Sequence, residues 1–90
     1  MSAKGEIGWK RRDEFGERVQ VKAKKVGDQW RFHIRARRFD EWQPHDEPPL
    51  EDWLELLDCV ERRVQRHRIP EEELPRLKRM MRELFPTETI

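Results

Sequence analysis

Ninety residues, with 43% charged and 34% hydrophobic side chains, suffice for one small domain with a thin core and exclude a second domain. The longest apolar runs are two residues, which excludes a membrane-spanning helix, and the single cysteine excludes an internal disulfide framework. The net charge of +1 conceals a split, because residues 1–40 hold 12 Lys and Arg against 6 Asp and Glu, whereas residues 41–90 hold 8 against 13.

The start of the sequence is polar. Residues 1–8 carry few apolar anchors and are predicted to form a flexible tail, with no secretory signal peptide, so we expect a reducing, cytoplasmic location. Residues 9–12 are equally compatible with a short N-terminal edge strand and with an irregular segment. Residues 13–16 indicate a turn. One domain is expected over residues 9–86, and a second tail over residues 87–90.

A β-hairpin is predicted next, because apolar and polar residues alternate along residues 17–26 and again along residues 29–38. Gly27 and Asp28 suit a two-residue turn, in which glycine adopts a positive φ at little cost. Such a turn fixes the register. On one face it pairs Val19 with Ala36, Val21 with Ile34 and Ala23 with Phe32; on the other it pairs Arg18 with Arg37, Lys22 with His33 and Lys24 with Arg31.

Two amphipathic helices follow a loop over residues 39–49. The first is predicted over roughly residues 49–67, and the second begins between Glu71 and Leu74 and ends before Pro86. Apolar residues at helical spacing mark the buried face of the first: Leu50, Trp53, Leu54, Leu57, Val60 and Val64, widened by Leu56 and His67. Those of the second are Leu74, Leu77, Met81, Leu84 and Phe85.

The predicted fold class is therefore α+β in the order β-β-α-α. An antiparallel hairpin, with or without a third N-terminal edge strand, precedes two helices that pack on one of its faces. The opposite face of the hairpin is expected to be solvent-exposed.

That solvent face is basic and carries no acidic residue: it holds Arg18, Lys22, Lys24, Arg31, His33, Arg35 and Arg37. Like charges directly opposite each other destabilise a sheet, where mixed pairs would gain about 0.2–1 kcal/mol. Phosphates would remove this repulsion, because each phosphate neutralised releases counterions. We therefore predict a non-enzymatic protein that binds nucleic-acid phosphates through these side chains. Trp30 and Phe32 point to the other face, which favours the backbone of a duplex over stacked single strands.

A protein-interaction module is the alternative. The carboxylates Glu51, Glu55 and Asp58 line the outer face of the first helix and match the basic hairpin of a second copy, which would give a homodimer. An acidic protein partner would also suit the basic hairpin. Trp42 is either an anchor for such a partner or a lid over the core. A third interpretation is a basic face that only protects the strands from aggregation.

No metal, cofactor or catalytic site is predicted. The histidines and Cys59 lack the spacing of metal ligands, and there is no glycine-rich phosphate loop. Carboxylates cluster in the loop before the first helix, but the sequence places no basic or nucleophilic companion beside them. No membrane partner is expected either.

Overall fold

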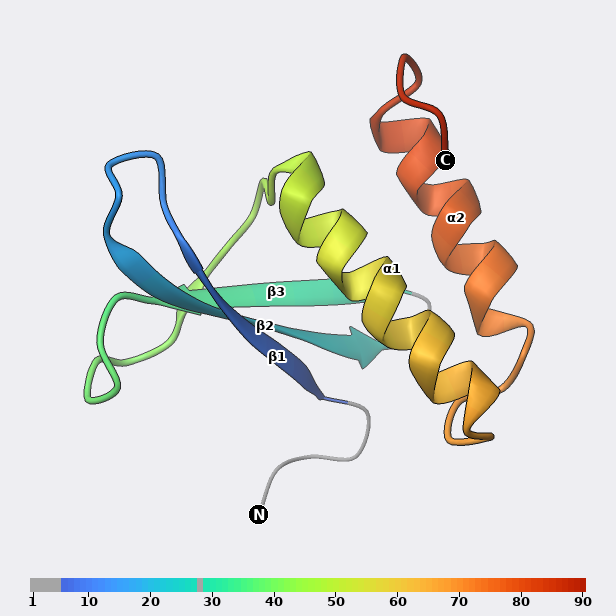
Figure 1. Ribbon diagram of the computed structural model, residues 1–90, viewed down its shortest axis with the longest axis horizontal. Helices are drawn as coiled ribbons and strands as arrows, with labels where there is room; N and C mark the ends of the chain where they lie inside the picture. The colour runs from blue at the N-terminus through green and yellow to red at the C-terminus, as the bar shows by residue number, and fades with distance from the viewer. Residues whose placement is uncertain (1–5, 28) are drawn as a thin grey trace. The chain divides into compact units, whose positions relative to one another are not determined.

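The computed structural model describes residues 6–27 and 29–90. The chain divides into two compact units, the first ending at Pro48 and the second beginning at Pro49. A four-stranded antiparallel sheet forms the first unit and two helices form the second (Figure 1). This order of strands before helices confirms the predicted α+β class. The expectation of one domain over residues 9–86 stays a prediction.

The sheet has the strand order β1-β2-β3-β4, so that strands consecutive in sequence are also hydrogen-bonded neighbours. The strands are β1 Ile7–Arg12, β2 Arg18–Val26, β3 Gln29–Arg35 and β4 Gln43–Pro44. The N-terminal edge strand thus exists, and it begins before residue 9. Ile7 and Gly8, which the sequence assigned to a tail, belong to the sheet, and the side chain of Ile7 is only 2% exposed.

The β2–β3 pairing has the predicted register. Val21 lies opposite Ile34, and Ala23 lies opposite Phe32. Gly27, the first residue of the turn, has a φ of 62°, as a primed turn requires. The second predicted turn residue, Asp28, lies outside the described residues.

The end of β3 departs from the prediction, because the strand stops at Arg35 rather than at residue 38. A local turn replaces the ladder there: the Arg37 amide donates to Asp40 Oδ2 at 3.1 Å, and the Asp40 amide donates to the Arg37 carbonyl at 3.0 Å. The predicted pairs of Val19 with Ala36 and of Arg18 with Arg37 are therefore wrong. Arg18 instead lies opposite Arg12 of β1.

Strand β4 lies within the segment that the sequence assigned to a loop. Gln43 pairs with Ile34, Pro44 pairs with His33, and the His45 amide donates to the Phe32 carbonyl at 2.9 Å. Proline has no N–H and is tolerated at a sheet edge, which is the place of β4 in the strand order. Because β4 is directly preceded by Trp42, the pairing holds this tryptophan beside β3.

One face of the sheet is apolar. Its side chains are Ile7, Val19, Val21, Ala23 and Phe32, all of them buried. The Trp9 ring meets Phe32 edge-on, with ring centres 6.1 Å apart. Since successive side chains alternate between faces, the residues between these point to the opposite face.

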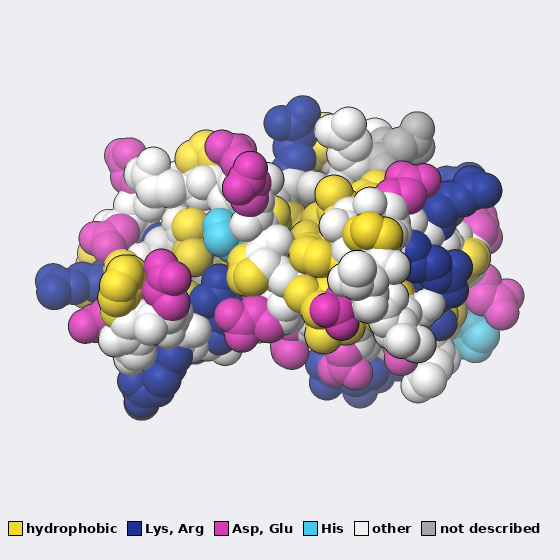
Figure 2. Space-filling model, turned by 90° about the horizontal axis from the view of Figure 1, so that it is seen from above, with side chains coloured by type: hydrophobic (Ala, Val, Ile, Leu, Met, Phe, Trp, Pro, Cys, Tyr) yellow, Lys and Arg dark blue, Asp and Glu magenta, His cyan; other side chains and the backbone are white. Residues whose placement is uncertain are grey.

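The second unit consists of α1 Leu50–Gln65 and α2 Glu73–Leu84, which lie side by side and antiparallel (Figure 1). Most of the predicted apolar residues are buried or half-buried. Leu54 and Leu84 are exceptions, 45% and 54% exposed respectively. Figure 2 shows hydrophobic side chains of this kind on the surface among acidic and basic ones. Conversely, the sequence did not single out Asp52, which is buried in the first turn of α1, where the helix dipole favours a carboxylate.

The turn that follows helix α1 contains a left-handed residue that is not glycine. The Arg68 amide donates to the Arg63 carbonyl at 2.8 Å, and the His67 amide donates to the Val64 carbonyl at 3.0 Å, which is the hydrogen-bond pattern of a Schellman end. His67 has a φ of 58° and is exposed. Its predicted place on the apolar stripe is wrong, because the helix ends before it.

Replacing His67 with glycine should stabilise the chain relative to replacing it with alanine. An L side chain in the left-handed conformation costs roughly 1–2 kcal/mol, whereas glycine loses about 0.5–1 kcal/mol more backbone entropy on folding. We therefore expect the free energy of unfolding of His67→Gly to exceed that of His67→Ala by about 0.5–1 kcal/mol in urea denaturation. Equal stabilities would contradict the left-handed end of α1.

Candidate functional site

The polar face of the sheet carries seven Lys and Arg side chains from three strands. This basic face comprises Lys10 and Arg12 of β1, Arg18, Gln20, Lys22 and Lys24 of β2, and Arg31, His33 and Arg35 of β3. Like charges lie directly opposite each other at two places, Arg12 with Arg18 and Lys24 with Arg31. The positive charge is thus built into the pairing of the strands.

Most of the predicted binding residues belong to this face. Arg18, Lys24 and Arg31 are exposed on it, and Lys22, His33 and Arg35 are half-buried. Arg37 lies beyond the end of β3, in the turn closed by Asp40. Lys10 and Arg12 were missed, although the alternation of side chains along β1 places both beside the β2 cations once that strand is recognised.

Trp42 lies against the basic face. The Lys22 ammonium is 4.5 Å from the centre of the Trp42 ring, and the guanidinium carbon of Arg35 is 4.2 Å from it. Both distances lie within the range of a cation–π interaction. The premise that this face has no aromatic side chain is therefore wrong. Strand alternation alone does not reveal Trp42, because it reaches the face from the segment before β4.

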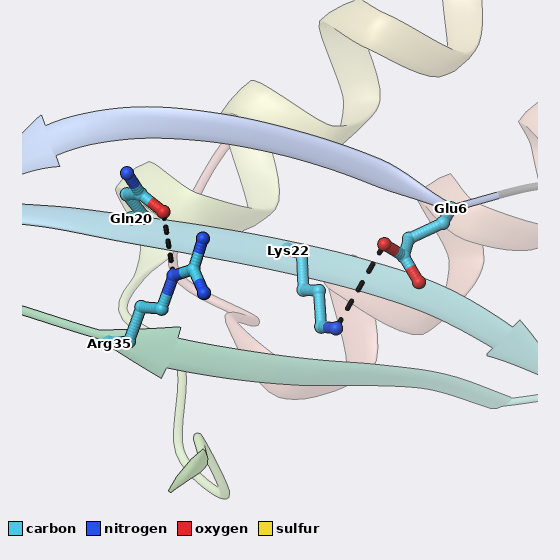
Figure 3. Close-up of polar contacts among 4 residues, drawn as sticks. All are labelled: Glu6, Gln20, Lys22 and Arg35. Carbon is cyan, nitrogen blue, oxygen red and sulfur yellow. Dashed lines mark hydrogen bonds and ion pairs between the residues drawn. The ribbon is translucent and has the colours of Figure 1, made fainter. Parts of the chain in front are cut away.

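Two polar contacts order the side chains next to Trp42 (Figure 3). Arg35 Nε donates to Gln20 Oε1 at 2.8 Å, and Lys22 Nζ lies 3.9 Å from Glu6 Oε1. Within the described ranges, no other carboxylate comes within 4.0 Å of a cation of the basic face. Lys10, Arg18, Lys24 and Arg31 therefore have no carboxylate of those ranges within 4.0 Å.

Several hollows open at this face, one of which, of about 690 Å³, has Asp13 and Glu17 beside Arg12 and Arg18 in its lining. The basic hollow, of about 530 Å³, is lined by Lys10, Arg11, Arg12, Arg18, Val19, Gln20, Ala36 and Arg38. Five of these residues are Lys or Arg and none is acidic. The hollow lies where β3 leaves the sheet, so that Arg18 and Val19 have no partner on β3.

The second hollow, here called the Trp42 hollow, has a volume of about 250 Å³. It is lined by Glu6, Gly8, Trp9, Lys10, Gln20, Val21, Lys22 and Trp42. Lys10 and Gln20 line both hollows, so the two adjoin on the sheet surface. Cations, an amide and an aromatic ring are thereby brought together from β1, β2 and the segment before β4.

The loop between β1 and β2 and the loop between β3 and β4 lie at the same end of the sheet, which is the end that holds the basic hollow (Figure 1). Each loop carries one exposed phenylalanine. Phe15, in the loop between β1 and β2, is 81% exposed, and Phe39, in the loop between β3 and β4, is 93% exposed. Asp13 Oδ1 shapes the first loop by accepting hydrogen bonds from the amides of Phe15 and Glu17, both at 2.9 Å. Apolar and positive surface therefore occur together at this end.

The acidic face of α1 is partly neutralised within the helix. Glu51, Glu55 and Asp58 are all exposed, and Asp58 Oδ2 lies 3.0 Å from Arg62 Nη2. The pKa of the Arg62 guanidinium is raised by its hydrogen bond to Cys59 Sγ and, further, by the Asp58 carboxylate. A partner-binding role for these three carboxylates stays a prediction.

Comparison of the chain with protein-family models, curated proteins and solved structures finds no significant match. Within the part of the chain that the structure describes, no three His, Cys, Asp or Glu side chains gather in a way that would hold a metal ion. No helix in that part has the length and apolar character needed to cross a bilayer. The function must therefore be inferred from the basic face and its hollows.

The contact between Trp42 and Arg35 should be measurable as a coupling energy. We expect a double-mutant cycle of Trp42→Leu and Arg35→Gln, followed by urea denaturation, to give about 0.5–1 kcal/mol of favourable coupling. Arg31→Gln is the control, since Arg31 lies on the same strand and face but pairs with Lys24. A coupling with Trp42 that is as large for Arg31 as for Arg35 would contradict the geometry.

Proposed function

We propose that this chain binds nucleic acid, with the cations of the basic face contacting phosphates. The observation that carries the proposal is that Lys10, Arg18, Lys24 and Arg31 lie on one face of a paired sheet with no carboxylate from the described ranges within 4.0 Å. The adjoining basic hollow, with five cations and no acid in its lining, has the charge and size to receive a phosphate.

Energetic considerations support this reading. The chain has 19 acidic against 20 basic residues, so mixed cross-strand pairs were available to it, yet the basic face pairs Arg12 with Arg18 and Lys24 with Arg31 and contains no mixed pair. Each such pair forgoes about 0.2–1 kcal/mol and adds repulsion. A polyanion removes the repulsion and releases counterions in the same step. The repulsion that destabilises the free chain therefore strengthens the binding of a polyanion, because binding removes it.

Protection against aggregation explains the basic face less well. Lysines protect a sheet when they lie on its edge strands, where unpaired N–H and C=O groups are exposed. Here β2 and β3 are interior strands, since the order is β1-β2-β3-β4. Of the five cations on these two strands, Lys22 pairs with Gly8 on one side and with His33 on the other, so protection of an edge does not explain its charge.

The competing function is binding of an acidic protein or a second copy of the chain. An acidic protein would bind the basic face, and a second copy would present the acidic face of α1 to it, although Asp58 of that face is already paired with Arg62 at 3.0 Å. The mass measured by light scattering distinguishes the two functions. A salt-sensitive dimer that does not bind nucleic acid would support this second function.

The salt dependence of binding tests the phosphate contacts. In the triple variant Arg18→Gln, Lys24→Gln and Arg31→Gln, we expect the slope of log Kd against log salt for a labelled DNA to fall by about 2–3. The reason is that each lost phosphate contact removes roughly 0.7–0.9 from that slope. Lys22 and Arg35 are left intact because they hold Trp42.

The matched control is the triple variant Arg66→Gln, Arg68→Gln and Arg79→Gln. It changes the net charge by the same amount, and its three side chains are exposed in the second unit. Its salt slope should equal that of the unmodified chain. Equal slopes for the two triple variants, or no binding of DNA at low salt, would reject the proposal.

A change of opposite sign provides an independent check. Glu6→Gln removes the carboxylate that lies 3.9 Å from Lys22, so nucleic acid should bind about two- to fivefold more tightly at low salt. Glu55→Gln makes the same change of charge on the exposed face of α1 and should leave the affinity unchanged. Identical gains from the two variants would mean that overall charge, rather than the basic face, governs binding.

A further inference from the structure

The Trp42 hollow combines an aromatic wall with polar groups. Its volume of about 250 Å³ is below the roughly 300–1,000 Å³ of sites for drug-sized ligands, so it suits a single planar ring system. Gln20 and Glu6 add hydrogen-bonding groups at its border, and Lys10 and Lys22 add positive charge. This set of groups matches a nucleobase with the phosphate attached to its sugar.

The aromatic wall is held in place before any ligand binds. Trp42 is half-buried, its ring is in contact with Lys22 and Arg35, and β4 pairs with β3 immediately after it. A side chain that is already positioned loses little conformational freedom on binding. Nucleobases of any sequence stack on such rings, since each base has a π-face.

Gly8 is the second feature that makes the hollow. It lies opposite Lys22 on the basic face, between strand residues that have side chains. A Cβ at this position would meet the Val21 carbonyl oxygen at 3.6 Å and Lys22 Cβ at 3.9 Å, which are ordinary contacts, and the backbone there is not left-handed. The fold therefore does not require glycine here, and the missing side chain leaves space for a ligand.

The position of the Trp42 hollow relates a base to a phosphate. Lys10 and Gln20 line both hollows, so a base in one places its neighbouring phosphates beside the cations of the other. In a duplex the bases are stacked and paired, whereas in a single strand they are splayed out and stack on aromatic side chains. Resting on the proposed function, we infer that the Trp42 hollow takes one unpaired nucleobase and that the natural ligand is a single-stranded nucleic acid.

The test compares the full chain with variants against two probes, a labelled oligothymidylate and a duplex of equal length. The unmodified chain should bind the single strand roughly tenfold more tightly than the duplex. Gly8→Val should place a side chain in the hollow, where its Cβ makes only ordinary contacts, and Trp42→Leu should remove the aromatic wall. Each variant should weaken single-strand binding roughly tenfold and leave duplex binding unchanged. Trp30→Leu, on the opposite face, is the control and should change neither.

Fluorescence provides a readout that does not depend on the stability of Trp42→Leu. Oligothymidylate should quench the tryptophan emission of the unmodified chain, and Trp42→Phe should abolish that quenching while keeping most of the affinity. Equal affinity for the two probes, or a Gly8→Val variant that binds the single strand as before, would overturn the inference and leave the proposed function standing. If the chain binds neither probe, or binds polyglutamate as tightly as oligothymidylate, both the inference and the proposed function are overturned.

Discussion

The register of the β2–β3 pairing governs both faces of the sheet. With Val21 opposite Ile34, the buried side chains Val19, Val21, Ala23 and Phe32 share one face, and the residues between them must share the other face. A slip by one residue would turn Lys22 and Lys24 inward and expose the valines, at the cost of burying unpaired charge. Burial of the apolar side chains therefore fixes the register. This register places the cations next to one another, so that they repel each other.

Trp42 lessens that repulsion at one point of the basic face. The negative face of its ring attracts Lys22 and Arg35 at 4.5 and 4.2 Å, and Gln20 accepts a further hydrogen bond from Arg35. These two cations are thereby engaged in ordering the aromatic side chain. The exposed cations farther along the strands, such as Lys24 and Arg31, have no such partner among residues 6–27 and 29–90, and in the proposed function they are the ones that contact the ligand. Some cations of these strands therefore position the Trp42 ring, and other cations of the same strands supply the exposed positive charge.

The sequence predicts what local patterns determine. Alternation and a turn glycine determine the hairpin register, and helical spacing locates both helices to within a few residues. The end of β3 could not be predicted, because the side chain of Asp40 stops the ladder through a hydrogen bond that alternation does not reveal. Strand β4 is two residues long and includes Pro44, so that it has neither periodicity nor typical strand composition. The position of Trp42 depends on β4. Because the sequence did not predict β4, the basic face was expected to lack an aromatic side chain, and duplex binding was expected for that reason.

Charge alone discriminates poorly among polyanions, since phosphate and carboxylate polymers both release their own condensed counterions when a row of cations neutralises them. In the proposed function the ring of Trp42 would supply the discrimination, because a carboxylate polymer has no planar ring to stack on it. A duplex meets the requirement for charge but keeps its bases within the stack. A ligand that satisfies the cations and the ring together must carry a phosphate next to a base that is free to leave its neighbours. The proximity of the two hollows, which share Lys10 and Gln20, therefore restricts the ligand more than either hollow would alone.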